Sequence, residues 1–130
     1  MTRSSVRAQP MIAVTAVEKS SAWYQLVLGV SSGHGGTEYE QLRSDGVLVM
    51  QLHRLEVGHH HGAIGDPALP VGNGVALWFE LDDLDEAVRR TASAGVEVVT
   101  ELHHNPNAGH RELWLRDPDG YLVVLADQVA

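Results

Sequence analysis

The sequence predicts an α+β fold made of two consecutive modules, each with the order strand, helix, strand, strand, strand. The first observation behind this prediction is a hairpin near the end of the chain, where apolar residues 113–115 and 121–126 flank Asp117-Pro118-Asp119-Gly120. Proline at the second position and glycine at the fourth favour a tight type I turn. Because residues 121–126 are almost wholly apolar, this strand is expected inside a sheet and not at a bare edge.

The second observation is an internal repeat. Gly29 and Gly95 each follow a stretch with helical periodicity and are expected to end a helix. Asp45-Gly46 and Asp119-Gly120 each mark a turn between apolar runs. The two glycines lie 66 residues apart and the two turn pairs 74 residues apart. The second copy is therefore about eight residues longer between its helix and its final hairpin, as is typical of a diverged duplication.

The first module is expected over residues 11–53, after a flexible N-terminus at residues 1–10. Residues 11–17 form an apolar run typical of a buried strand. Residues 18–28 place their apolar side chains at helical spacing. A loop at residues 31–36 follows, and two further strands are expected over residues 37–42 and 47–53.

The second module is expected over residues 75–127, after a loop at residues 54–74 that is rich in histidine, glycine and proline. Its first strand is expected over residues 75–81. Asp82 or Asp83 is suited to cap a helix that runs to Ala94. A strand over residues 96–102 and a loop over residues 103–109 then lead to the final hairpin.

Composition narrows the classes of function. The chain has 130 residues, of which 44% are apolar, no cysteine and a net charge of −8. This length supports one domain with a shared core, and the lack of cysteine excludes disulfides and thiolate metal sites. A nucleic-acid partner is not expected, because a phosphate backbone requires a basic surface. No apolar run has the length of a membrane span or a signal peptide, so we expect a cytoplasmic protein without a membrane partner.

Three separated segments resemble the vicinal oxygen chelate superfamily. They read SSAWYQLVLG at residues 20–29, WFELDDLDEAVRRTASAG at residues 78–95 and LRDPDGYLVVLAD at residues 115–127. That superfamily includes glyoxalase I, extradiol dioxygenases, and fosfomycin and bleomycin resistance proteins. The resemblance implies that the two βαβββ modules form an open, ligand-enclosing β-barrel-like sheet. It also implies a homodimer, in which modules of two subunits often complete one cavity.

Metal-dependent members of the superfamily take their ligands from the start of each module's first strand and the middle of its last strand. Carried over to this chain, these positions fall on Gln9, Met50, Ala76 and Val124. Zinc requires three or four protein ligands, and iron typically requires two histidines and a carboxylate. Only Gln9 offers an oxygen, so no cofactor is expected at these positions, and the metal chemistry of the superfamily is not expected either.

Histidines elsewhere in the chain offer an alternative metal site. His59, His60 and His61 lie in the central loop, and His53 ends the strand before it. Consecutive histidines do not converge on one ion as a pair on a helix or strand does, so a solvated loop is the competing interpretation. The alternative cofactor is a divalent metal held at a non-standard site by His53, His59 and His61.

Catalysis without a metal requires a general acid or base, and His110, Glu112 and His53 are the predicted catalytic candidates. His110 and Glu112 flank Arg111, so alternation along a strand places them on one face. An ordinary salt bridge is the other interpretation of this group. For His53, the other interpretation is a side chain that caps the end of a strand.

The predicted ligand contacts gather around the positions where relatives bind a metal. Trp78 lies two residues after Ala76, so its ring is expected to point into the cavity and stack on a flat ligand, with core packing as the alternative. The expected ligand-binding residues are Met50, Ala76, Trp78, Val124, Leu48 and Arg111.

Two functions are consistent with these observations. The first is a glyoxalase- or bleomycin-resistance-like protein that binds a small organic molecule in a metal-free, largely apolar cavity. The alternative is an enzyme, of a lyase, isomerase or dioxygenase-like type. Such an enzyme would use histidine and glutamate as acid and base, or the relocated histidine metal site.

Overall fold

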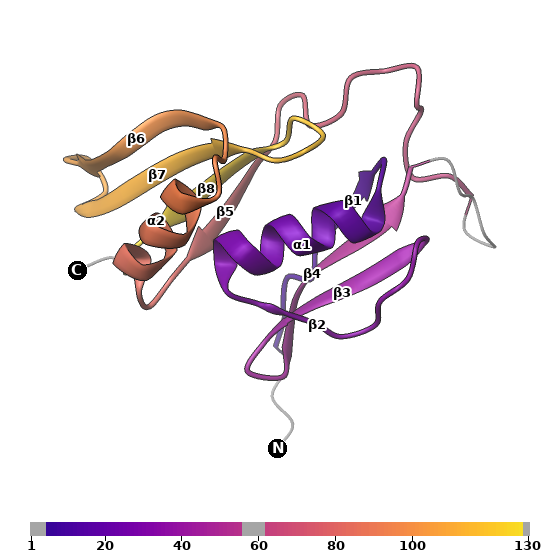
Figure 1. Ribbon diagram of the computed structural model, residues 1–130, viewed down its shortest axis with the longest axis horizontal. Helices are drawn as coiled ribbons and strands as arrows, with labels where there is room; N and C mark the ends of the chain where they lie inside the picture. The colour runs from indigo at the N-terminus through magenta and orange to yellow at the C-terminus, as the bar shows by residue number, and fades with distance from the viewer. Residues whose placement is uncertain (1–4, 56–61, 129–130) are drawn as a thin grey trace.

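Each module consists of one four-stranded sheet with one helix packed on one of its faces (Figure 1). The structure is a computed structural model that describes residues 5–55 and 62–128. The first module contains β1 (Met11–Val14), α1 (Val17–Leu28), β2 (Ser31–Ser32), β3 (Tyr39–Ser44) and β4 (Val47–Arg54). The second contains β5 (Ala76–Glu80), α2 (Leu84–Ser93), β6 (Val98–Asn105), β7 (His110–Arg116) and β8 (Leu122–Ala126).

The two sheets have the same topology, which confirms the predicted pair of βαβββ modules. The strand order is β1-β4-β3-β2 in the first sheet and β5-β8-β7-β6 in the second. In each sheet the first strand is parallel to the last, and the other neighbours are antiparallel. The long connection that a parallel pair requires contains the helix, so α1 and α2 occupy equivalent places in the two modules.

The ends of the helices and the first hairpin follow the predicted local signals. Gly29 at the end of α1 has φ 74°, in the left-handed region that glycine adopts without strain. Asp83 caps α2 by accepting a hydrogen bond from a backbone N–H in the first turn, at 3.1 Å. Asp45 and Gly46 have φ of 48° and 79° between β3 and β4, as a type I′ turn requires. Of the described helices, neither is long and apolar enough to cross a membrane.

The bounds of several strands differ from the predicted ranges. β1 ends at Val14 and not at residue 17, because α1 begins at Val17, and the predicted loop over residues 31–36 contains β2. β3 spans residues 39–44 and not 37–42, and β6 continues to Asn105 where the prediction ended it at residue 102. β6 is longer because it stays paired with β7 up to the pair Asn105 and His110. His103 and His104 therefore belong to a strand and not to a loop, and Asn105 lies opposite His110.

The hydrophobic core is continuous across the two modules and lies between the helices and the sheets. Tyr24 and Val27 of α1 are fully buried against the first sheet, and Ala87 of α2 is fully buried against the second. Fully buried side chains from the strands complete this core, among them Leu42, Leu52, Leu115, Val123 and Leu125.

The turn between β7 and β8 joins the two modules. The carboxylate of Asp119 accepts a hydrogen bond from the Thr15 hydroxyl at 2.7 Å. The hydroxyl of Tyr24 in α1 donates to Asp117 at 2.6 Å. The hydroxyl of Tyr121 donates to a backbone carbonyl oxygen of β1 at 2.8 Å. The final hairpin is thus bonded to the first strand and the first helix of the other module.

The face of each sheet opposite its helix is not covered by any helix of the described chain, and the two sheets do not close on each other (Figure 1). We call this face the open face of each sheet. The exposed side chains on the open faces are therefore available to a ligand or to another protein.

Candidate functional site

The open face of the second sheet carries two tryptophan side chains beside one buried valine. Three residues are paired in register across adjacent strands, namely Trp78 of β5, Val124 of β8 and Trp114 of β7. The rings of Trp78 and Trp114 meet edge to face with centroids 6.2 Å apart. Val124 is fully buried, whereas Trp78 is 48% exposed. We call Trp78, Trp114 and Val124 the tryptophan face, and it presents an aromatic surface suited to stacking on a flat ligand.

A buried carboxylate lies beside the tryptophan face. The side chain of Glu112, only 2% exposed, accepts hydrogen bonds from His110 Nε2 at 2.6 Å, Asn105 Nδ2 at 2.8 Å and Trp114 Nε1 at 2.9 Å. His110 and Glu112 thus share one strand face, as alternation predicts. We call Glu112, His110 and Asn105 the His–Glu cluster. The ring centroid of His110 is 5.7 Å from that of Trp78, so the cluster and the tryptophan face form one site.

Glu112 is ionised although it is buried. Burial raises the pKa of this carboxyl, but the hydrogen bonds from Trp114, Asn105 and His110 outweigh burial and hold the pKa below its usual range. An ionised carboxylate only accepts hydrogen bonds. All three partners of Glu112 are therefore donors.

A cavity of about 350 Å³ adjoins the His–Glu cluster. Its volume lies near the lower end of the range for small-molecule sites. His103 Nε2 lies 4.0 Å from the Glu112 carboxylate, so a second imidazole stands at the edge of the cluster. The residues that line the cavity come from β6, β7 and the turn between them, and they are Thr100, His103, Asn105, Pro106, Glu112 and Trp114.

Arg111 points away from this site. Its guanidinium donates to Asp127 at 2.7 Å and to Asp85 of α2 at 2.9 Å. The hydrogen bonds to Asp85 and Asp127 raise the pKa of Arg111. Arg111 therefore connects the helix to the hairpin, while its neighbours in sequence lie on the open face. A ligand contact of Arg111 stays a prediction.

The open face of the first sheet is polar where that of the second is aromatic. The Tyr39 hydroxyl donates to Gln51 Oε1 at 2.6 Å and accepts from Gln41 Nε2 at 3.1 Å. Arg43 Nη2 donates to Gln41 Oε1 at 2.8 Å. His53 pairs with Tyr39 across the strands, is 2% exposed, and has Nδ1 2.9 Å from the carbonyl oxygen of the next residue. His53 therefore lies on a different sheet from the His–Glu cluster.

The two predicted ligand contacts of β4 lie on opposite faces of the sheet. Met50 is fully buried in the core on the side of α1. Leu48 pairs with Arg43, whose guanidinium lies on the open face. The cause is a bulge between Leu42 and Arg43, where the register shifts and the simple alternation of faces is lost. Met50 therefore lies in the core and not beside the tryptophan face, and a ligand contact of Met50 stays a prediction.

The residues at the four family metal positions do not fit a hard metal ion. Gln9 is exposed at the start of the first module, and Met50 lies in the core. Ala76 and Val124 share the open face of the second sheet, but their side chains carry no donor atom. Imidazole and carboxylate, the usual ligands of zinc and iron, are missing from all four positions.

The alternative metal site remains a prediction. His59 and His61 lie outside the residues that the structure describes. Within residues 5–55 and 62–128, no three histidine, aspartate or glutamate side chains are grouped closely enough to hold a metal ion. The alternative site therefore depends on the central loop and on His53.

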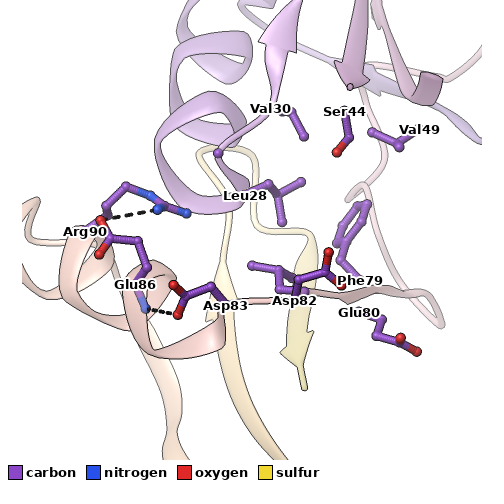
Figure 2. Close-up of a pocket in the computed structure, with 12 residues that line it drawn as sticks. Leu28, Val30, Ser44, Val49, Phe79, Glu80, Asp82, Asp83, Glu86 and Arg90 are labelled. Atoms are coloured by element: carbon purple, nitrogen blue, oxygen red, sulfur yellow. Dashed lines mark hydrogen bonds and ion pairs between the residues drawn. The ribbon is translucent and has the colours of Figure 1, made fainter. Parts of the chain in front are cut away.

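A second cavity, of about 330 Å³, lies at the junction of the two modules (Figure 2). Three of its charged side chains serve the fold. Asp83 caps α2, Glu86 forms an ion pair with Arg90, and Arg90 donates to the carbonyl oxygen of Leu26 at 2.7 Å. We therefore place the functional site at the tryptophan face. The apolar wall of the junction cavity consists of Leu28, Val30, Val49, Phe79 and Leu81.

Two βαβββ modules, each with parallel first and last strands and an open sheet face, define a glyoxalase-type α+β fold. The family model of the Glyoxalase/Bleomycin resistance protein/Dioxygenase superfamily matches residues 7–125, and the chain belongs to this superfamily. The match includes both modules and confirms the resemblance of the three sequence segments. No curated protein sequence matches the chain.

Solved structures share this fold over nearly the whole chain. TioX from Micromonospora sp. ML1 is 20% identical with a TM-score of 0.71, over 94% of this chain and 98% of that one. Lactoylglutathione lyase from Agrobacterium tumefaciens is 18% identical with a TM-score of 0.69, over 96% of each chain. The fosfomycin resistance protein FosX from Listeria monocytogenes is 16% identical with a TM-score of 0.64, over 97% of this chain and 95% of that one. At these identities the comparisons show the fold alone.

Proposed function

We propose that this protein binds a small, flat organic molecule on the tryptophan face, without the metal used by many of its relatives. The observation that carries the proposal is the half-exposed ring of Trp78, set edge to face against Trp114 beside a buried hydrogen-bonding cluster. Stacking on an aromatic side chain contributes about 1–3 kcal/mol. Ala76, at one of the family metal positions, is exposed on the same sheet face and adds apolar surface to it.

Charge favours a neutral or cationic ligand. The chain has a net charge of −8, and Glu112 adds an ionised carboxylate at the site, so an anion would be repelled. Three donors already bond Glu112, so we expect the ligand to contact the aromatic rings and the edge of the His–Glu cluster.

A cytoplasmic location, without a nucleic-acid or membrane partner, stays a prediction from the composition.

We also propose a homodimer in which a sheet of one copy covers the tryptophan face of the other. The proposal is supported by the superfamily and by large apolar side chains on the surface, since Trp78 is 48% and Val47 54% exposed. Light scattering after size-exclusion chromatography should give twice the chain mass of 14.1 kDa. A monomer at the concentrations used for binding would contradict this proposal.

An acid–base enzyme is the second candidate function, and the 2.6 Å contact between His110 and Glu112 favours it. A carboxylate that holds an imidazole in one orientation is a recurring arrangement for a general base. Lyase or isomerase chemistry would then proceed through His110. A dioxygenase-like reaction would instead require the alternative metal site.

A fluorescence titration with flat aromatic compounds tests the binding proposal. Replacing Trp78 by leucine should weaken binding about tenfold or more, because one stacking partner is lost. Trp23→Phe on α1, outside the site, should leave binding unchanged and serves as the control. Equal affinity of the Trp78→Leu variant and the wild type would contradict the proposal.

Turnover and metal content separate the alternatives. Conversion of α-oxo, hydroxy or epoxide compounds that is lost in Glu112→Gln supports the enzyme, whereas binding without turnover supports the binding protein. Metal analysis of untagged protein tests the relocated site. A stoichiometric ion that disappears in His59→Ala or His61→Ala would establish that site and count against a metal-free function.

A further inference from the structure

One nitrogen atom of the His–Glu cluster has no partner within the described chain. His110 is 7% exposed, and its Nδ1 is buried without a hydrogen bond to any described residue. Its Nε2, in contrast, lies 2.6 Å from Glu112. Buried polar atoms nearly always have a partner, because burying one without a hydrogen bond costs free energy. An unpaired nitrogen beside an exposed aromatic surface therefore calls for an explanation.

The cluster determines which nitrogen of His110 carries the proton. Glu112 is an ionised carboxylate and can only accept, so Nε2 of His110 must donate to it. In the neutral imidazole, the other nitrogen then has a lone pair and no proton. When the imidazole is neutral, Nδ1 is thus a hydrogen-bond acceptor without a donor.

The imidazole ring that carries this acceptor packs against the proposed ligand surface. The ring of Trp78 packs against that of His110 at an interplanar angle of 57°, with the centroids 5.7 Å apart. No hydrogen bond from the described residues holds the indole of Trp78, so ring contacts with His110 and Trp114 position it. The His110 ring therefore borders the tryptophan face, and a flat ligand stacked on that face lies beside it.

We propose that Nδ1 of His110 is the hydrogen-bond acceptor of the ligand site, so that the ligand is a flat molecule with an O–H or N–H donor at its edge. This inference rests on the proposed function, because it requires stacking on the tryptophan face. Phenols, amides and N–H heterocycles have the required donor, and their O-methyl and N-methyl derivatives lack it. His110 then determines specificity, and Glu112 is a positioning residue that holds the tautomer.

Phenol and anisole are suitable probes, because they share one ring and differ in the donor. We expect phenol to bind about fivefold more tightly than anisole, as one net hydrogen bond predicts. In a nuclear magnetic resonance titration of ¹⁵N-labelled protein, phenol should shift the Nδ1 resonance of His110 and anisole should not. Both compounds should shift the indole resonances of Trp78 and Trp114. Before any addition, the protein should show the tautomer of His110 protonated at Nε2.

Two variants separate the roles of the two nitrogen atoms. In His110→Gln the side-chain amide reaches the Nε2 position and keeps a donor for Glu112, but the acceptor at Nδ1 is lost. In His110→Asn the amide oxygen replaces Nδ1, and the donor to Glu112 is lost. The preference for phenol should disappear in His110→Gln and persist in His110→Asn.

The outcomes distinguish this inference from the proposed function. If neither phenol nor anisole shifts the indole resonances, the proposed binding on the tryptophan face and the role of His110 are both overturned. If both compounds bind equally and shift them, the binding surface stands and the role of His110 is overturned. Protonation at Nδ1 in the wild-type protein overturns that role as well. The comparison of phenol with anisole and the tautomer of His110 are both measured on the wild-type protein. These two results therefore test the role of His110 even where a variant fails to fold.

Discussion

Glu40 shows how a single buried side chain supports this fold. It is 3% exposed on β3, and its carboxylate accepts hydrogen bonds from Ser32 Oγ at 2.7 Å, Ser21 Oγ at 2.8 Å and the backbone N–H of Gly35 at 2.8 Å, among others. Burial raises the pKa of Glu40, but these hydrogen bonds outweigh burial and lower the pKa to about 2. One ionised carboxylate therefore ties α1 and the loop after it to the first sheet.

Replacing Glu40 by glutamine should lower the free energy of unfolding by about 2–4 kcal/mol near neutral pH, because an amide presents a donor where several donors converge. In the folded state the pKa of Glu40 is lowered from 4.5 to about 2. Its contribution is therefore complete above pH 4.5 and is lost as the pH falls towards 2. Urea denaturation should show the gap between wild type and Glu40→Gln closing over that range.

Glu101→Gln is the matched control for this prediction. Glu101 is an exposed residue of β6, so its replacement should change stability by less than about 0.5 kcal/mol. A gap between wild type and Glu40→Gln that stays constant as the pH falls would contradict the structural role assigned to the carboxylate.

The candidate site could be predicted from the sequence only in part. Alternation along a strand was enough to place His110 and Glu112 on one face. The position of their partner Asn105 depends on the register between β6 and β7. That pairing contains two register shifts, so the position could not be counted from the sequence. The burial of Met50 in the core could not be predicted either, because the bulge beside it in the first sheet has no signature in the sequence. Local sequence patterns therefore predicted that His110 and Glu112 share a face. The residues around this pair depend on the register between distant strands, which local patterns do not reveal.

At the scale of secondary-structure elements, the turn between β7 and β8 has two roles. The Oδ1 atom of Asp117 accepts from the backbone N–H groups of Asp119 and Tyr121, each at 2.9 Å, and so shapes the turn. The Oδ2 atom accepts from the hydroxyl of Tyr24, which lies 93 residues away in sequence. The first role is local chemistry, and the turn itself was predicted from its proline and glycine, although the hydrogen bonds of the Asp117 side chain were not. The second role could not be predicted, because the sequence gives no sign of which distant hydroxyl reaches the turn.

Tyr24→Phe should lower the free energy of unfolding by about 1.5–3 kcal/mol, because it removes a buried hydrogen bond to a carboxyl group. Tyr24 is fully buried, so water does not replace the lost donor. Tyr39→Phe makes the same chemical change at a half-buried hydroxyl within one module, and should cost only about 0.5–1 kcal/mol. Equal losses in urea denaturation of the two variants would show that the turn does not join the modules.

At the scale of the whole molecule, the two modules meet at a second place, where α2 approaches the end of α1 (Figure 2). Arg90 of α2 donates to the carbonyl oxygens of Leu26 and Val27 at 2.7 Å and 3.4 Å. The last carbonyl groups of a helix have no partner within it, and they carry partial negative charge. A guanidinium from one module therefore completes a helix of the other, while the two open sheet faces stay available for a ligand and a second copy.

Arg90→Met should lower the free energy of unfolding by about 1–2 kcal/mol, because the carbonyl groups at the end of α1 lose a charged donor. Arg89→Met is the matched control on the same helix. The Arg89 side chain is 66% exposed and pairs with Glu86, and an exposed ion pair contributes about 0–1 kcal/mol. Hydrogen exchange adds a local measurement, since the backbone amides in the last turn of α1 should exchange faster in Arg90→Met and at the wild-type rate in Arg89→Met. Unchanged protection of these amides in Arg90→Met would show that α1 does not depend on the second module at this point.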